Sequence, residues 1–102
     1  MTVWFVSRHP GAVEWARRQG LCVDRWVPHL DLQAVGPEDT VVGTLPVQLT
    51  AEVCRRGARY LHLSVDMLPQ DRGRELSADD LASRNARLEA YEIFSFTRTG
   101  TS

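Results

Sequence analysis

The sequence contains no lysine, because all 12 of its basic residues are arginine. Biased genome composition would produce this pattern, and so would selection for guanidinium groups, which bind phosphates through two hydrogen bonds at once. The net charge is −1. A chain without excess positive charge lacks the electrostatic field that drives non-specific binding of long nucleic acids. Any recognition of anions must therefore be local.

Long apolar runs and cysteines are also scarce. No stretch reaches the ~18 apolar residues of a membrane span and no signal peptide opens the chain, so we expect a cytoplasmic protein without a membrane partner. Cys22 and Cys54 stand among apolar neighbours. We expect them to be buried free thiols and not a disulfide or a metal pair. Histidines at positions 9, 29 and 62 match no compact ligand spacing, so neither a metal site nor a cofactor is predicted.

The length of 102 residues suits one small domain with a thin core, which self-association would stabilise. We place this domain at residues 1–91 and a C-terminal tail at residues 92–102. Within the tail, residues 93–96 are a candidate extra strand, and the last residues are expected to be disordered.

Apolar runs and turn residues predict the secondary structure. Strands are expected at residues 2–7, 22–27, 40–43 and 59–65, and helices at residues 10–19, 46–56 and 77–91. Thr44 and the Ser77 capping signal are the expected N-caps of the last two helices. Residues 29–39 form either a short helix or a wrapped loop, and residues 66–76 a charged loop. This alternation predicts an α/β fold with a mainly parallel sheet of four or five strands, in the order 2-1-3-4.

In that order the winding direction reverses between the strands at 2–7 and 40–43, which opens a crevice at their carboxyl ends. The turns at residues 7–11 and 43–46 border this crevice, and each leads into a helix. We therefore expect two positive helix ends to converge on one cleft, a setting that favours an anion such as a phosphate.

Three polar residues follow the first strand directly. Arg8 either binds phosphate, pairs with Glu14 or holds its head group in water. Ser7 either caps the turn or contacts a ligand. His9 has a side chain suited to proton transfer near neutrality, although a histidine in a turn is commonly structural.

The remaining candidates come from the glycines and from later loops. Gly11 and Gly43 suit tight turns, and their small size also lets a phosphate approach the backbone. His62 lies on the semi-polar face of its strand and is either structural or a ligand contact. Arg72 and Arg74 make the loop at 66–76 either a basic lid over a polyanion or an ordinary solvated loop.

Three blocks of sequence resemble a small family of CRISPR-associated proteins from type III systems, known as Csx sixteen. They are Val-Trp-Phe-Val-Ser-Arg-His-Pro-Gly-Ala-Val-Glu-Trp at residues 3–15, Asp-Thr-Val-Val-Gly-Thr-Leu-Pro at residues 39–46, and Glu-Val-Cys-Arg-Arg-Gly-Ala-Arg-Tyr-Leu-His-Leu-Ser at residues 52–64. The resemblance covers roughly residues 2–91 and does not extend to the tail.

The resemblance implies a small Rossmann-like three-layer domain and a ring nuclease. Such an enzyme opens a cyclic oligoadenylate, most commonly cyclic tetra-adenylate, without a metal, and so switches off antiviral signalling. The linear product ends in a 2′,3′-cyclic phosphate. A homodimer suits the symmetry of the ring. The matching positions imply a catalytic set and a ligand-binding set, namely Ser7, Arg8 and His9 for the first, and Pro10, Gly11, Gly43, Thr44 and His62 for the second.

Three other functions remain open. A sponge would bind the messenger in the same cleft without cutting it. A regulatory partner of the CRISPR effector would need no nucleotide at all. A phosphomonoesterase is the third, since a strand followed by Arg8 and His9 is similar to the histidine phosphatases. Against it, Pro10 follows the histidine here, and no second Arg/His pair is evident.

Overall fold

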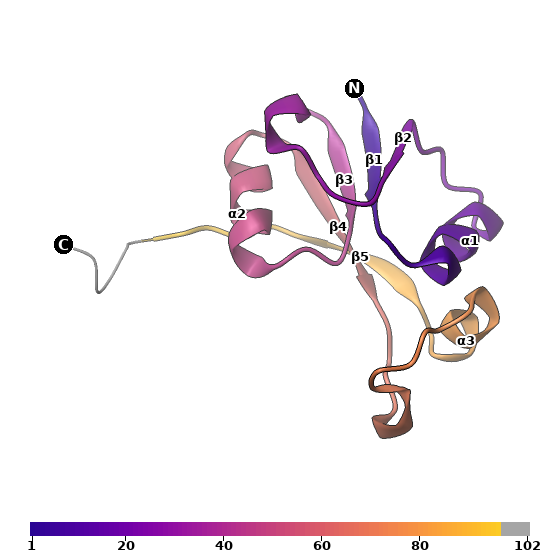
Figure 1. Cartoon of the computed structure of the whole chain (residues 1–102). Coiled ribbons are helices and arrows are strands. Elements are labelled where there is room, and N and C mark those ends of the chain that lie inside the picture. The colour runs from indigo at the N-terminus through magenta and orange to yellow at the C-terminus, as the bar shows by residue number, and fades with distance from the viewer. Residues whose placement is uncertain (97–102) are drawn as a thin grey trace.

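The computed structural model describes residues 1–96, and in this part of the chain five strands form one sheet in the order β2-β1-β3-β4-β5 (Figure 1). The strands are β1 (Val3–Val6), β2 (Arg25–Val27), β3 (Thr40–Gly43), β4 (Arg59–Ser64) and β5 (Arg87–Tyr91). β1 pairs in parallel with β2 and β3, and β3 with β4, whereas β5 is antiparallel to β4. The predicted α/β class, the mainly parallel sheet and the order of the first four strands are confirmed.

Helices cover both faces of this sheet and make three layers. They are α1 (Pro10–Arg18), α2 (Val47–Arg55) and α3 (Ala78–Ser83), with short 3₁₀ turns η1 (Leu32–Ala34) and η2 (Pro69–Asp71). α1 and α3 lie on one side of the sheet and α2 on the other (Figure 1). None of the helices in the described part of the chain has the length and hydropathy that a bilayer crossing requires.

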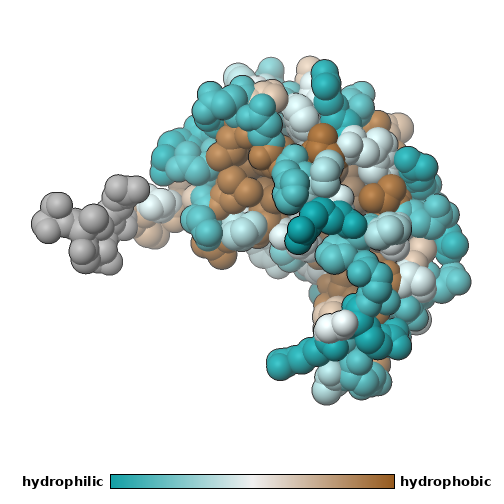
Figure 2. Space-filling model, viewed as in Figure 1, coloured by the Kyte–Doolittle hydropathy of each residue, from teal (hydrophilic) through white to brown (hydrophobic). Residues whose placement is uncertain are grey.

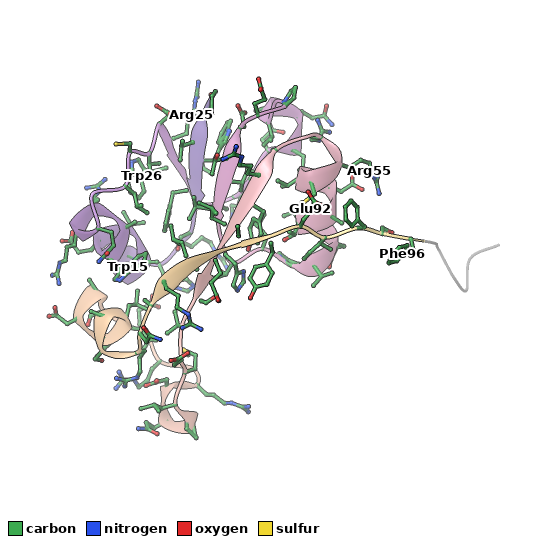
Figure 3. The ribbon with its side chains drawn as sticks, turned by 180° about the vertical axis from the view of Figure 1, so that it is seen from behind. Trp15, Arg25, Trp26, Arg55, Glu92 and Phe96 are labelled. Atoms are coloured by element: carbon green, nitrogen blue, oxygen red, sulfur yellow. The ribbon has the colours of Figure 1, made fainter. Side chains whose placement is uncertain are left out.

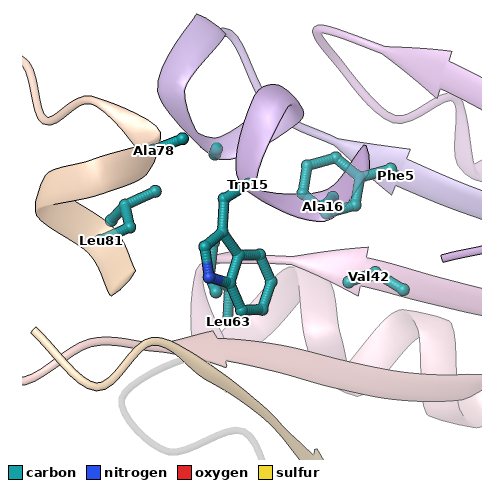
Figure 4. Close-up of a cluster of buried hydrophobic side chains, with 8 residues drawn as sticks. Phe5, Trp15, Ala16, Val42, Leu63, Ala78 and Leu81 are labelled. Atoms are coloured by element: carbon teal, nitrogen blue, oxygen red, sulfur yellow. The ribbon is translucent and has the colours of Figure 1, made fainter. Parts of the chain in front are cut away.

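The period-two alternation of the strands divides the core between the two faces. On the α1 side, Phe5, Val42 and Leu63 pack against Trp15 and Leu81 (Figure 4). The other face packs against α2 and the segment around η1, through Trp4, Val6, Val41, Tyr60, Val35, Val53 and Ala58. Because both faces of β1 and β3 are buried, these strands appear in the sequence as continuous apolar runs.

The predicted helix at 77–91 is wrong in its second half. α3 ends at Ser83, and Asn85 adopts a left-handed conformation with φ 56° that stops the helix. The chain then reverses into β5, whose Leu88 pairs with Leu63 of β4. The apolar alternation of Ala86, Leu88 and Ala90 therefore fits a strand. β5 also takes the edge of the sheet that the predicted extra strand at 93–96 would have used.

Residues 92–96 form neither helix nor strand. They run past α2, where Figure 3 shows Glu92 and Phe96 on the same side of the molecule as Arg55. Phe94 and Phe96 are exposed there, and hydrophobic surface gathers over the α2 side of the molecule in Figure 2. The disorder expected for the last residues of the tail falls on positions 97–102, outside the described residues.

Two local predictions are also wrong. Cys22 is exposed and Cys54 only half-buried, because β2 begins at Arg25 and leaves Cys22 in the preceding connection. Thr44 does not cap α2, whose N-cap is Pro46 without a side-chain hydrogen bond. Thr44 is instead an exposed residue of the turn after β3.

Candidate functional site

A cavity of about 250 Å³ opens at the carboxyl ends of β1 and β3, between the start of α1 and the loop that follows β4. It is lined by Phe5, Val6, Ser7, His9, Ala12, Gly43, Thr44, Leu63, Val65, Met67, Arg74, Glu75, Leu76 and Leu81. Five residues that the sequence singled out thus meet in one cavity, namely Ser7, His9, Gly43, Thr44 and Arg74. This is the position at which open parallel sheets bind their ligands.

The cavity has an apolar floor and polar side chains around its mouth. Strand residues such as Phe5 and Leu63 are buried, whereas His9, Arg74 and Glu75 are exposed. An apolar slot with a few polar groups at its edge suits a flat, weakly polar ring that carries charged substituents.

Ser7 is fixed in the turn that leaves β1. Its backbone N–H donates to the Val27 carbonyl oxygen at 3.0 Å, and its Oγ accepts a hydrogen bond from the His9 backbone N–H at 3.0 Å. The hydroxyl therefore caps the turn and lines the cavity at the same time. Its own hydrogen is not used in this bond and can be donated to a ligand.

His9 pairs with a carboxylate that the sequence did not single out. Its Nδ1 lies 2.8 Å from Glu75 Oε1, and the two side chains are 63% and 66% exposed. A pair this exposed stabilises the fold by only about 0–1 kcal/mol, so its main effect is to orient the imidazole. When Nδ1 donates to Glu75, Nε2 carries a lone pair that can accept a proton.

Arg8 lies beside the cavity without lining it. Its side chain is exposed, and it forms no ion pair with any of residues 1–96. The expected partner Glu14 accepts instead from Arg18 Nε at 3.1 Å. The Arg8–Glu14 ion pair, one of the alternatives predicted from the sequence, is therefore not formed. The Arg8 side chain is exposed to solvent instead.

Pro10 and Gly11 begin α1 and border a shallow groove next to the cavity, shared with Glu75. A Cβ atom at Gly11 would overlap the Leu76 carbonyl oxygen. The small size of this glycine therefore allows the backbone at Leu76 to pack closely against the start of α1. The same holds for Gly43, where a Cβ atom would lie 2.7 Å from the Val6 carbonyl oxygen. Contact of either glycine with a phosphate stays a prediction.

We expected the N-terminal ends of two helices to meet at the cavity, and for α2 this prediction is wrong. His9, the N-cap of α1, lines the cavity, but no residue of α2 does. His62 is also absent from the cavity lining. It faces the α2 side and borders a separate pocket of about 220 Å³ with Tyr60 and Tyr91.

The loop after β4 forms the outer wall of the cavity and projects from the body of the domain (Figure 1). Much of its surface is hydrophilic in Figure 2, although Met67 and Leu68 are exposed on it. Arg74 lines the cavity and pairs with Asp80 of α3 at 3.3 Å, whereas Arg72 does not line it.

Deeper in the loop, the buried Asp71 carboxylate accepts hydrogen bonds from Arg84 at 2.7 and 3.0 Å. Arg84 is the main cause that lowers the pKa of Asp71 to about 2.

Sequence reasoning missed the apolar residues Val65, Met67 and Leu76 as well as Glu75. One signal could have pointed to these residues. The loop at 66–76 follows β4, the neighbour of β3, and so leaves the sheet at the same edge as the turns after β1 and β3. Within the described residues, no group of three or more metal-ligating side chains comes together.

The family comparison gives one match. The family model described as "Putative CRISPR-associated protein (Cas_VVA1548)" matches residues 4–94, which cover all of the sheet except Val3, the first residue of β1. No curated protein and no solved structure matches the chain.

Proposed function

Because the chain belongs to the Cas_VVA1548 family of CRISPR-associated proteins, we propose that it is a ring nuclease of type III systems that binds a cyclic oligoadenylate and opens it. Cyclic tetra-adenylate is the first candidate ligand. The observation that carries the proposal is the cavity at the carboxyl ends of β1 and β3, in which Ser7, His9 and Arg74 surround an apolar floor. An adenine ring fits the floor, and the backbone phosphates would then lie at the polar mouth.

The size of the cavity supports a homodimer. A volume of about 250 Å³ lies just below the range of about 300–1,000 Å³ that is typical of small-molecule sites, and it suits about one nucleoside, not a ring of four nucleotides. Two cavities related by a two-fold axis would each bind one nucleoside, taken from opposite halves of a near-symmetric ring. The expected stoichiometry is therefore one ring for two chains.

In the proposed step, the ribose 2′ oxygen attacks the adjacent phosphorus. The bond from phosphorus to the 2′ oxygen forms and the bond to the 5′ oxygen breaks, which leaves a linear chain ending in a 2′,3′-cyclic phosphate. His9 Nε2 accepts the proton of the 2′-hydroxyl. The leaving 5′ oxygen takes a proton from water, and the imidazolium returns a proton to the resulting hydroxide.

The other residues act on charge and position. Arg8, Arg74 and the Ser7 hydroxyl supply hydrogen bonds to the phosphoryl oxygens, and each bond to a charged group contributes about 1.5–3 kcal/mol. General base catalysis by His9 would contribute about 10²–10⁴-fold. Glu75 holds the imidazole in the tautomer that this role needs.

The test is turnover of excess cyclic tetra-adenylate in EDTA, with products followed by chromatography and mass. Wild-type protein is expected to produce the linear cyclic phosphate over many turnovers. His9→Ala should keep ring binding and lose cleavage, and Arg8→Ala should weaken binding. His29→Ala and Arg59→Ala are the matched controls, since both residues are exposed and neither lines the cavity. An unchanged rate in His9→Ala would refute the assigned base.

A sponge is the second candidate function. The observation in its favour is the exposure of His9 and Glu75, which are open to water and so not held in the dry surroundings that strengthen catalytic groups. A ring that stays intact but bound would establish this function. If the ring is neither bound nor cleaved, cyclic tetra-adenylate is refuted as the ligand. The search would then move to other ring sizes and to the CRISPR effector.

A further inference from the structure

The Tyr60 hydroxyl lies at the junction of three polar groups. Its oxygen is 2.9 Å from the Leu45 backbone nitrogen, 3.0 Å from the Gly43 carbonyl oxygen and 2.8 Å from His62 Nδ1. Tyr60 is only 3% exposed, so little of its side chain is open to bulk water. Burial raises the pKa of Tyr60, and the hydroxyl therefore keeps its hydrogen.

Counting hydrogens decides which group donates to which. A phenolic hydroxyl has one hydrogen to donate and two lone pairs to accept with. The Leu45 N–H occupies one lone pair. The Gly43 carbonyl can only accept, and the hydroxyl donates its hydrogen to it at 3.0 Å. The contact with His62 is then a hydrogen bond only if Nδ1 itself carries a hydrogen.

The alternative leaves one contact without a hydrogen. If Nδ1 were bare, the hydroxyl hydrogen would serve either His62 or Gly43. The remaining contact would then bring two lone pairs together within 3.0 Å at a buried site. Unsatisfied buried polar groups are costly, and native structures avoid them.

We propose that His62 is held as the Nδ1–H tautomer and, through the Tyr60 hydroxyl, is a positioning residue for the turn at residues 43–45. Gly43 and Thr44 of this turn line the cavity on the other side of the sheet. His62 thus acts on the cavity through the backbone, in place of the direct ligand contact that the sequence suggested. The consequence for the ligand rests on the proposed function, whereas the tautomer does not.

The surroundings of His62 agree with this assignment. Its ring meets Tyr91 edge-on at a centroid distance of 5.9 Å, and Glu89 is its cross-strand neighbour on β5. Among residues 1–96, the one hydrogen bond of its imidazole is the bond to Tyr60. The bond at one ring nitrogen sets the tautomer of a neutral imidazole. Tyr60 is therefore the residue that selects the Nδ1–H form.

The first test reads the tautomer directly in the full chain. Long-range ¹H–¹⁵N spectra at alkaline pH, where imidazoles are neutral, distinguish the protonated from the bare nitrogen of each histidine. His62 is expected to show a protonated Nδ1 and a bare Nε2, and Tyr60→Phe should remove that preference without moving the exposed His29. A wild-type spectrum with a protonated Nε2 at His62 would overturn the proposal.

The second test reads the turn. In Tyr60→Phe, the Leu45 amide loses its acceptor and should exchange its hydrogen about tenfold faster or more. The amide of Val42, inside β3, serves as the control and should be unchanged. Equal Leu45 exchange in the variant and the wild type would show that the hydroxyl does not hold the turn.

The third test connects the turn to the cavity. His62→Asn offers an amide N–H near the place of Nδ1–H, whereas His62→Leu offers none. With cyclic tetra-adenylate, His62→Asn should keep the wild-type KM, and His62→Leu should raise KM about tenfold with a smaller change in kcat. An equal loss in both variants would overturn the positioning role. If wild-type protein does not bind the ring, the proposed function fails, and the spectra and exchange rates still decide the tautomer and the turn.

Discussion

Arg84 donates two hydrogen bonds to the Asp71 carboxylate, from Nε at 2.7 Å and from Nη2 at 3.0 Å, and thereby ties the loop after β4 to the end of α3. The Asp71 side chain is fully buried and that of Arg84 is 18% exposed. A buried carboxylate is tolerated only when it is well paired. The pair therefore fixes the loop that carries Arg74 and Glu75 to the cavity.

Asp71→Asn is expected to lower Tm by several degrees, because it removes the carboxylate that accepts two hydrogen bonds from the largely buried Arg84 guanidinium. Thermal unfolding followed by circular dichroism measures this. Asp31→Asn is the matched control, since Asp31 is an exposed aspartate without an ion pair in the described structure. A similar Tm in both variants would contradict the role of the pair.

The same pair predicts a pH dependence. The pKa of Asp71 is lowered to about 2 in the folded state, mainly by Arg84, and an unfolded aspartate titrates near 3.9. The stabilisation is therefore complete above about pH 4 and is lost as pH falls toward 2. Urea unfolding at successive pH values should show a steeper loss of stability below about pH 4 in the wild type than in Asp71→Asn. Parallel curves would show that Asp71 is not the group responsible.

Gly11→Ala should destabilise the fold by about 1–3 kcal/mol, because the new methyl group collides with the Leu76 carbonyl oxygen and the backbone must move. The displaced segment includes Glu75, so the contact with His9 should also be lost. Gly36→Ala is a suitable control, since its nearest heavy atom would lie at an ordinary 3.7 Å. Urea unfolding of both variants measures the difference, and equal stabilities would refute the close approach.

Glu75→Gln should lower the cleavage rate about tenfold, a fraction of the 10²–10⁴ that a general base contributes. The amide keeps the shape of the carboxyl group but no longer fixes Nδ1–H of His9, because it offers a donor as well as an acceptor. Single-turnover kinetics with cyclic tetra-adenylate isolates this step. Glu92→Gln, an exposed change outside the cavity, should have no effect. A wild-type rate in Glu75→Gln would remove Glu75 from the mechanism.

Glu38→Gly is expected to stabilise the protein. Glu38 has a φ of 71°, which is strained for any residue with a Cβ atom. Glycine removes the strain but loses more conformational entropy on folding. The net increase in the free energy of unfolding is roughly 0.5–1 kcal/mol. The backbone bond from the Glu38 N–H to the Gly57 carbonyl oxygen is retained. Chemical denaturation followed by tryptophan fluorescence measures the gain, and a loss of stability would show that the side chain makes a compensating contact.

The fold was predictable where local pattern and burial agree. The run at 40–43 is apolar between turn residues, and β3 has the same bounds, Thr40–Gly43. The prediction that Ser77 caps α3 is confirmed, since Ser77 Oγ accepts a hydrogen bond from the Asp80 backbone N–H at 3.1 Å. The end of α3 was missed although Asn85 and the apolar alternation after it are local signals for a stop and a strand, because the strand at Arg87–Tyr91 forms only against the free edge of β4. That edge is a tertiary feature, and no local pattern encodes it.

The site was predictable to the extent that strand order determines it. Ser7, His9, Gly43 and Thr44 follow two central parallel strands, and the topology alone brings such residues together. The opposite wall comes from a loop whose position depends on buried pairing at Asp71. Glu75 is 66 residues from His9 in the sequence, so no spacing rule connects the two.

This separation has a consequence during protein synthesis. The cavity is lined both by Phe5 of β1 and by Leu81 of α3, which are far apart in the sequence. The cavity therefore cannot form until the segment from β1 to α3 has been synthesised, and a fragment that lacks α3 lacks part of its wall. The cavity is in this sense a product of translation through α3, and the proposed ligand binding is expected to be lost in a fragment that ends before Leu81.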